Sequence, residues 1–185
     1  MTFFPKLGRK STPLAQKGKI SGDIKRRLAG LRAIIMEADG VLTNGRLIYD
    51  LNGTEYKQFH FRDAAAVSPL QKSGLVVGVV SARESGTVSR WCADLRMDFC
   101  HQGILDKVST VSKLAAHYHL KLKEVAFIGS DLNDVPVLEM VGLSVTAADA
   151  PDYVKKACDL VTRAKGGNGV FREIVDLLLQ KKRSS

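Results

Sequence analysis

Short apolar runs that alternate with helical patterns constrain the fold of this 185-residue chain more than any other feature. The clearest runs cover residues 33–36, 75–80 and 125–128. Continuous apolar runs of this length are typical of strands that are buried on both faces of a sheet. Shorter strands are expected at residues 99–100, 143–145 and 160–162. Because strands that alternate with helices form a parallel sheet covered on both faces, the sequence predicts one α/β domain over residues 21–180.

Helical patterns separate these strands, and some of them begin or end at a recognisable cap residue. Ser21 is the predicted N-cap of a helix over residues 24–28, and Gly30 ends that helix. Asp63 is the predicted N-cap of the next helix, which runs to Lys72. Further helices are predicted at residues 88–95, 105–119, 135–140, 151–157 and 170–179.

A β-hairpin is predicted between the first strand and the helix that ends at Lys72. Asn52-Gly53 lies between two runs rich in residues that favour strands, and this dipeptide is the strongest short hairpin signal. The apolar side chains of the hairpin, over residues 46–60, predict a surface that another part of the protein covers.

The net charge of +9 comes from the ends of the chain. Residues 1–30 and 181–183 together carry +10, which leaves −1 for residues 31–180. We expect residues 1–20 to form a basic, disordered tail and residues 181–185 to form a second basic tail. A nucleic-acid binder is not indicated, because the folded part lacks a basic face with interleaved aromatic residues.

The sequence gives no sign of a membrane span or a disulfide framework. No apolar run approaches the roughly 20 residues that a membrane-spanning helix requires, and the first residues do not resemble a signal peptide. Cys92, Cys100 and Cys158 are odd in number and lack the spacing of metal ligands. We therefore expect free thiols in a cytoplasmic protein.

Two acids follow the first apolar run directly. If residues 33–36 form a strand, Glu37 and Asp39 leave its end on the same side, and Gly40 lets the backbone bend away. Two carboxylates held this close repel each other unless a cation or a proton lies between them. This pair therefore predicts a functional site.

Ligands of parallel α/β sheets bind beyond the carboxyl ends of the strands. Polar residues follow three of the predicted strands there: Glu37, Asp39, Ser81, Arg83, Ser130, Asp131 and Asp134. Such a set suits phosphoryl transfer to a carboxylate nucleophile, with a second acid that protonates the leaving oxygen and then activates water. Magnesium would neutralise charge, and a lysine and a hydroxyl would bind the remaining phosphate oxygens.

The ordered motifs of the chain resemble those of the small, cap-less phosphatases of the haloacid dehalogenase superfamily. The closest resemblance is to the 3-deoxy-D-manno-octulosonate 8-phosphate (KDO 8-phosphate) phosphatases of lipopolysaccharide synthesis. It covers roughly residues 31–180, and the matching stretches are residues 38–43, 61–63, 80–83, 106–107, 131–134, 147–150 and 166–173. The resemblance implies a Rossmann-like three-layer sandwich with a central parallel sheet and the β-hairpin in place of a cap domain.

The resemblance also implies a role for each matching residue. Asp39 is the implied general acid and base, Glu37 stands at the position of the nucleophile, and Ser81 and Lys107 are the implied phosphate-binding residues. The implied magnesium site contains Glu37, Asp39, Ser130, Asp131 and Asp134. The implied substrate pocket contains Asp39, His60, Arg62, Asp63, Ala64, Arg83, Lys107 and Asn133. The family also implies a homotetramer in which the hairpins close a central barrel and the Gly-rich segment over residues 165–173 reaches a neighbour's site.

The chain departs from the family pattern where the chemistry is least tolerant. Glu37 replaces the nucleophilic aspartate and is one methylene longer, and a misplacement of about 1 Å can cost on the order of a hundredfold in rate. Ser130 replaces an aspartate that binds magnesium, so the site loses a carboxylate ligand. Ala64 replaces a glycine, and Asn168 replaces a basic residue in the Gly-rich loop.

Two hypotheses about function follow. The first is a magnesium-dependent phosphatase of an acidic sugar phosphate whose activity is impaired by Glu37 and Ser130. The second is a catalytically silent member of the family, kept as an oligomeric binding or scaffold protein. Phosphatase activity that depends on Asp39 distinguishes the two.

Overall fold

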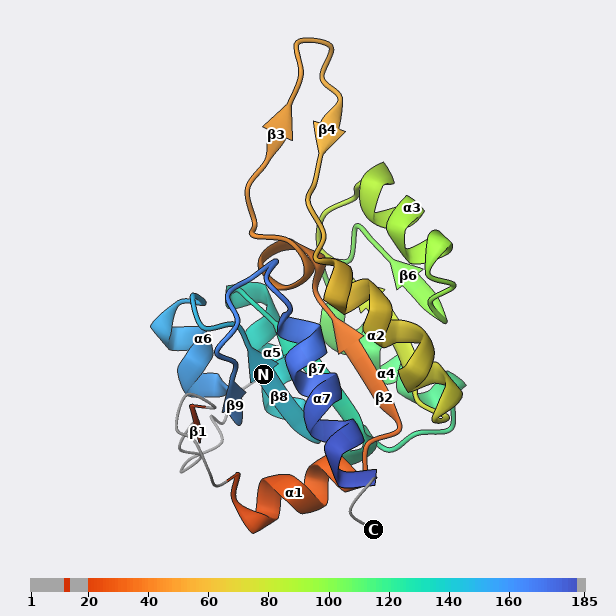
Figure 1. Cartoon of the computed structure of the whole chain (residues 1–185), viewed down its shortest axis with the longest axis vertical. Coiled ribbons are helices and arrows are strands. Elements are labelled where there is room, and N and C mark those ends of the chain that lie inside the picture. The colour runs from red at the N-terminus through yellow and green to blue at the C-terminus, as the bar shows by residue number, and fades with distance from the viewer. Residues whose placement is uncertain (1–11, 14–19, 183–185) are drawn as a thin grey trace.

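The computed structural model describes residues 12–13 and 20–182, and it has a parallel sheet between two layers of helices (Figure 1). The strands of this sheet lie in the order β1-β9-β8-β7-β2-β5-β6, and each neighbouring pair is parallel. Their bounds are Thr12–Pro13 (β1), Ala33–Met36 (β2), Val76–Val80 (β5), Phe99–His101 (β6), Val125–Gly129 (β7), Leu143–Thr146 (β8) and Leu160–Val161 (β9). The predicted Rossmann-like α/β class is confirmed.

Seven α-helices are present in the described part of the chain. They are α1 (Gly22–Ala29), α2 (Phe61–Lys72), α3 (Gly86–Asp94), α4 (Lys107–His117), α5 (Val135–Met140), α6 (Asp152–Ala157) and α7 (Val170–Lys182). Two short 3₁₀ turns occur at Leu122–Glu124 (η2) and Leu132–Asp134 (η3). A π-helical turn, η1, spans Ala38–Leu42 directly after β2, and the sequence analysis did not foresee it.

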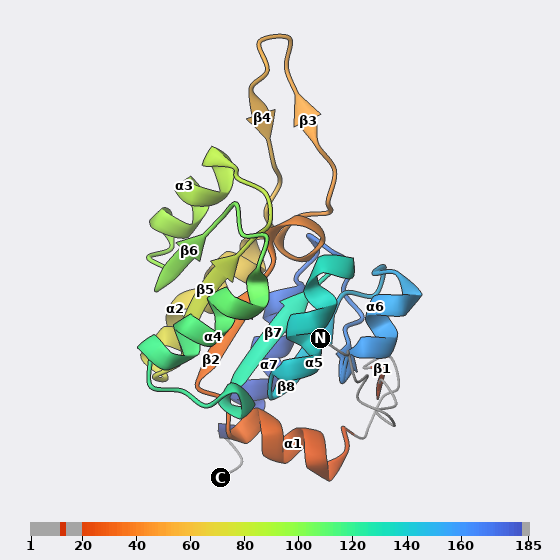
Figure 2. The same cartoon turned by 180° about the vertical axis from the view of Figure 1, so that it is seen from behind.

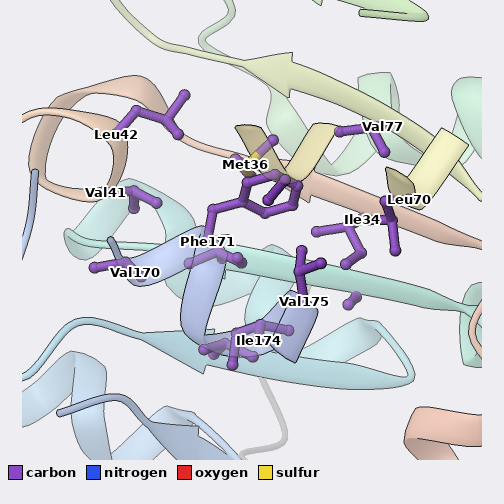
Figure 3. Packing of buried hydrophobic residues seen from close by; sticks show 14 of the residues in the cluster. Ile34, Met36, Val41, Leu42, Leu70, Val77, Val170, Phe171, Ile174 and Val175 are labelled. Carbon is purple, nitrogen blue, oxygen red and sulfur yellow. The ribbon is translucent and has the colours of Figure 1, made fainter. Parts of the chain in front are cut away.

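The alternation of side chains on β2 builds a core on each face of the sheet. Ile34 and Met36 belong to the cluster that includes residues of α1, α2, α3 and α7. Ala33 and Ile35 belong to the cluster that includes residues of α4, α5 and α6. Figure 3 shows the first cluster, where Phe171 of α7 packs beside Met36. Successive residues of a strand point to opposite faces of the sheet. A strand in a sheet that is covered on both faces therefore needs apolar residues at every position.

The helix that follows the hairpin begins earlier than predicted, and Asp63 is not its N-cap. α2 begins at Phe61, and its N-cap is His60, whose Nδ1 accepts a hydrogen bond from the backbone N–H of Arg62 at 3.2 Å. Asp63 lies inside the first turn and is fully buried. The other cap prediction is confirmed: the Oγ of Ser21 accepts from the backbone N–H of Ile24, and Gly30 ends α1.

The predicted hairpin is present and projects away from the body of the molecule (Figures 1 and 2). Its paired strands are only Ile48–Tyr49 (β3) and Glu55–Tyr56 (β4), which are shorter than the predicted runs. The carboxylate of Asp50 organises the turn, because it accepts from the backbone N–H groups of Asn52 and Thr54. Leu51 at the tip is fully exposed.

The first part of the chain was predicted to be a disordered tail. Thr12–Pro13 instead forms β1, an edge strand that pairs with β9. Residues 1–11 and 14–19 lie outside the described residues, as do residues 183–185 of the second predicted tail. In the described residues, no helix combines the length and apolar character of a membrane span.

Candidate active site

Polar residues that follow three adjacent strands meet at the carboxyl edge of the sheet. Glu37 follows β2, Ser81 follows β5 and Ser130 follows β7, and β2 lies between β5 and β7. Glu37 and Ser81 are 6% and 1% exposed, so both side chains lie below the surface. Lys107, the first residue of α4, reaches the same volume and is 2% exposed.

A buried ammonium group joins two of the predicted site carboxylates. The Nζ of Lys107 lies 2.5 Å from the Oδ1 of Asp134 and forms a second, shorter ion pair with the Oε2 of Glu37. Burial lowers the pKa of Lys107, but the charges of Asp134 and Glu37 outweigh this and raise the pKa above its ordinary value. Lys107 therefore stays protonated and shares its single positive charge between the two acids.

Asp39 is neutralised by different cations. Its Oδ1 lies 2.5 Å from the Nζ of Lys57 and accepts a hydrogen bond from the Oγ1 of Thr43 at 3.0 Å. Its Oδ2 lies 3.3 Å from Arg83. The two acids that were predicted to share a cation are thus each compensated separately, Glu37 by Lys107 and Asp39 by Lys57 and Arg83.

Lys57 was missed by the sequence analysis. It comes from the hairpin, its side chain has no exposed surface, and it also lies 3.4 Å from Glu55. Arg83 donates to Glu55 at 2.9 Å and to the Oη of Tyr49 at 3.2 Å. Glu55 and Lys57 are two residues apart on an extended segment and so face the same side. The spacing of two residues between Glu55 and Lys57, on a segment that leads back to the edge of the sheet, was the sequence signal that could have identified Lys57.

Glu55 ties the hairpin to the loop after β5. Burial raises the pKa of Glu55, but hydrogen bonds from Ser85 and Arg83 and the charge of Lys57 outweigh it and hold the pKa below its ordinary value. The Oγ of Ser85 donates to Glu55 at 2.6 Å. Glu55 is therefore a carboxylate that fixes both Arg83 and Lys57 beside Asp39.

Ser130 lies against the turn that carries Asp39. Its Oγ donates to the backbone carbonyl of Asp39 at 2.7 Å. Gly40 has a φ of +81°, and a Cβ at this position would lie 2.8 Å from the side chain of Ser130. Only glycine satisfies both the left-handed conformation and this close approach.

The two acids after Ser130 have separate partners. The Oδ2 of Asp134 accepts from the backbone N–H groups of Ser130 and Asp131, and its Oδ1 faces Lys107. The side chain of Asp131 accepts from the backbone N–H of Leu132 and from the Oη of Tyr153. Asp134 therefore orders the loop from inside, and Asp131 lies at its exposed outer side.

A cavity of about 320 Å³ opens beside Asp39 and Ser130. Asp131, Asp149, Asn44 and the backbone of η1 contribute to its lining. The Gly-rich loop closes one side of this region, because the backbone N–H of Gly167 donates to the carbonyl of Val41 and that of Gly166 donates to Asp149. This loop thus contacts η1 of its own chain, and its predicted contact with a neighbouring subunit stays a prediction.

The remaining predicted substrate residues are dispersed around the start of α2 and the loop after β7. Arg62 and Asn133 are exposed, and His60 and Ala64 are partly exposed. Asp63 is instead buried between α2 and α7, where its Oδ1 accepts from the backbone N–H of Arg172 at 2.7 Å. Burial raises the pKa of Asp63 to about 6, although the hydrogen bond from the backbone of Arg172 opposes the shift.

Comparisons with known proteins agree with this architecture. Residues 95–174 match the family of haloacid dehalogenase-like hydrolases. The chain is 37% identical over 162 residues to the 3-deoxy-D-manno-octulosonate 8-phosphate phosphatase of Haemophilus influenzae, and the match covers 88% of this chain and 90% of that protein. The chain belongs to the KDO 8-phosphate phosphatase family.

Solved structures of KDO 8-phosphate phosphatases share its fold. The enzyme from Yersinia pestis is 34% identical with a TM-score of 0.86, over 89% of each chain. The enzyme from Moraxella catarrhalis, solved in complex with magnesium ion, phosphate ion and KDO, is 28% identical with a TM-score of 0.83, over 85% of this chain and 91% of that one. The predicted family and the predicted fold are thus confirmed.

In the arrangement that the structure shows, the side chains at the predicted magnesium site do not form a binding site for a divalent cation. Among the residues that the structure describes, no group of three or more histidine, cysteine, aspartate or glutamate side chains is placed to hold a metal ion. Glu37 and Asp134 face Lys107, and Ser130 directs a hydroxyl donor at the carbonyl of Asp39. Magnesium binds several oxygen atoms, among them charged carboxylate oxygens. Here the ammonium group of Lys107 engages the carboxylates of Glu37 and Asp134, and the hydroxyl of Ser130 acts as a donor.

Proposed function

We propose that this protein is a phosphomonoester hydrolase of an acidic sugar phosphate of the KDO 8-phosphate type, with turnover impaired by Glu37 and Ser130. The observation that carries the proposal is the buried contact of Lys107 with both Glu37 and Asp134. It joins the nucleophile position, the phosphate-binding lysine and the loop after β7 in one volume. Membership of the KDO 8-phosphate phosphatase family supports the substrate class.

In the proposed reaction, a carboxylate oxygen of Glu37 attacks phosphorus and the bond from phosphorus to the sugar oxygen breaks. Asp39 protonates the leaving oxygen and then accepts a proton from the water that hydrolyses the acyl phosphate. Lys107 and Ser81 bind the phosphate oxygens. Arg83, held by Glu55, lies beside Asp39 where it would meet the carboxylate of an acidic sugar.

The same contacts supply the reason for slow turnover. Glu37 is ion-paired to Lys107, so its oxygen must give up that pair before it attacks. Ser130 adds no negative charge and is directed at the backbone of Asp39. Both substitutions weaken the alignment and charge compensation on which phosphoryl transfer depends.

Phosphate release from KDO 8-phosphate tests the proposal on wild type, Asp39→Asn and the double variant Glu37→Asp/Ser130→Asp, with and without magnesium. We expect measurable wild-type turnover, its loss in Asp39→Asn, and an increase on the order of a hundredfold in the double variant with magnesium. Asp152→Asn, whose side chain is 89% exposed, is the matched control for loss of a carboxylate and should keep wild-type turnover.

A catalytically silent binding or scaffold protein is the second candidate. It is favoured by the internal ion pairs of the site, in which Lys107 and Lys57 are both buried against carboxylates. An inert wild type together with an active double variant would establish this candidate and overturn the first. Turnover that survives Asp39→Asn would contradict the proposed role of Asp39.

A further inference from the structure

A second cavity lies at the opposite edge of the sheet from the candidate active site. It has a volume of about 340 Å³, close to that of the cavity beside Asp39 and Ser130. Its walls come from α1, from the ends of α2 and α7, and from the segments that lead into β2 and β5. Figures 1 and 2 show α1, the end of α7 and the start of β2 together at the end of the molecule away from the hairpin.

The lining of this cavity is mostly aliphatic, and we call it the leucine cavity. Ala29 and Gly74 line it and are exposed, so they mark the side that opens to solvent. Its volume falls within the range of small-molecule sites, which begins at about 300 Å³ and is mostly apolar. Six leucines supply most of the lining, and all but the last are buried: Leu28, Leu31, Leu70, Leu75, Leu178 and Leu179.

Arg32 is the charged residue among the described residues that line the leucine cavity. Its Nη1 donates to the backbone carbonyl of His119 at 3.3 Å, and its guanidinium has no carboxylate partner in the described part of the chain. The hydroxyl of Ser73, also in the lining, donates to the carbonyl of Leu70 at 2.7 Å. Because an arginine has five N–H donors, Arg32 still has donors for an anion.

We propose that the leucine cavity binds a fatty-acid carboxylate, with the alkyl chain against the leucines and the head group on Arg32. Burial of an alkyl chain on apolar side chains is favourable in proportion to the area removed from water. An arginine without an acidic neighbour in the lining selects a negative head group. The inference is independent of the phosphatase proposal, because no residue of this lining belongs to the candidate active site.

The charge of the chain disfavours two other occupants of the leucine cavity. Residues 1–11 contain Lys6, Arg9 and Lys10 and no acid, so this segment would bring positive charge to Arg32. A second copy with its leucine cavity against the first would bring two Arg32 side chains together. Like charges placed together across an interface are unfavourable. A ligand with an apolar chain and a negative head group avoids both costs.

Calorimetric titration of the full chain with sodium decanoate tests binding. Two amphiphiles with the same alkyl chain separate the contribution of the head group: decanol is uncharged, and decyltrimethylammonium is cationic. We expect one decanoate per chain, binding of decanol that is roughly tenfold weaker, and no binding of the cationic amphiphile. Octanoate, which is shorter by two methylene groups, should bind roughly tenfold more weakly than decanoate.

Substitutions in the lining, each with a matched control outside it, locate the site. Ala29→Trp fills the open side of the leucine cavity and should abolish decanoate binding, whereas Ala116→Trp, at an exposed alanine of α4, should not change it. Arg32→Gln should weaken decanoate roughly tenfold and leave decanol unchanged. Arg26→Gln removes an arginine of α1 whose side chain is 78% exposed, and it should change neither affinity.

Amide chemical shifts of the wild-type chain, recorded by NMR with and without decanoate, supply the position. We expect the largest changes in residues 28–32, 70–75 and 178–179. Changes centred on the hairpin residues 46–60, equal affinity for the three head groups, or no binding at millimolar decanoate would overturn the inference. So would binding to vesicles of anionic phospholipid without binding of decanoate, because the partner would then be a membrane surface.

Discussion

At the scale of the residue, Asp63 shows how tertiary burial changes the chemistry of a side chain. Its Oδ1 is paired with the backbone of Arg172, but its Oδ2 is buried without a hydrogen-bond partner among the described residues. Burying an unpaired carboxylate oxygen favours the protonated form. The pKa of Asp63 therefore rises from its ordinary value of 3.8 to about 6 in the folded protein.

This shift predicts a pH dependence of stability. Because the folded pKa lies above the unfolded one, the contribution of Asp63 is fully present below about pH 3.8 and is lost as the pH rises through about 6. The loss between pH 4 and pH 7.5 amounts to at most about 3 kcal/mol. Urea unfolding of wild type and Asp63→Asn at several pH values measures it. We expect a flatter profile in the variant and an unchanged profile in the exposed control Asp152→Asn.

The partners of Glu37 and Ser130 predict the response to metal. The ammonium of Lys107 already engages an oxygen of both Glu37 and Asp134, so millimolar magnesium or a chelator should leave the thermal midpoint of wild type unchanged. Ser130→Asp adds a carboxylate ligand beside the carbonyl of Asp39, and its midpoint should rise with magnesium. An equal magnesium-dependent rise in wild type would contradict the conclusion that the wild-type side chains do not fit the ion.

At the scale of the element, the packing of β5 against β6 depends on a residue with no side chain. A Cβ at Gly78 would overlap the ring of Phe99 on β6. Gly78→Ala should therefore destabilise the protein by about 1–3 kcal/mol, as overpacking does. Gly86→Ala is the matched control, because a Cβ there would meet nothing within 4 Å at the start of α3. Denaturant unfolding of both variants measures the difference, and equal stability would refute the packing argument.

The elements also mark where sequence reasoning succeeded and where it failed. β2 and α5 have the bounds that the sequence predicted, since an apolar run and a short amphipathic pattern define them locally. The start of α2 was wrong because His60 supplies the cap while Asp63 is drawn into the contact with α7. η1 was missed because its turn depends on Gly40 fitting against Ser130, which is 90 residues away.

At the scale of the whole molecule, the hairpin presents apolar side chains that the body of the chain does not cover. Leu47, Ile48 and Tyr56 are about half exposed, and Leu51 is fully exposed. A cluster of exposed apolar residues of this kind marks an interaction surface. The homotetramer implied by the family therefore remains our prediction for this surface.

Charged substitutions on the hairpin test that assembly. Ile48→Asp/Leu51→Asp should convert the tetramer to smaller species with the α/β fold retained, as measured by light scattering and circular dichroism. Leu105→Asp replaces a leucine that is 91% exposed and lies outside the hairpin residues 46–60, and it should leave the assembly unchanged. A wild-type chain that is monomeric at micromolar concentration would refute the prediction.

The sequence by itself determined the α/β class, the strand ends that carry Glu37, Ser81 and Ser130, and the family. These follow from local patterns, because apolar runs select buried strands and ordered motifs persist along the chain. It also led to the prediction that Glu37 and Ser130 alter the chemistry of the site.

Only the tertiary structure decided how the charges of the site are paired. Lys107 reaches Glu37 from 70 residues away, and Lys57 reaches Asp39 from the hairpin. The burial of Asp63 between α2 and α7 likewise depends on the tertiary structure. Such pairings depend on distances of a few ångströms between elements that are separate in the chain, and local sequence patterns do not contain those distances.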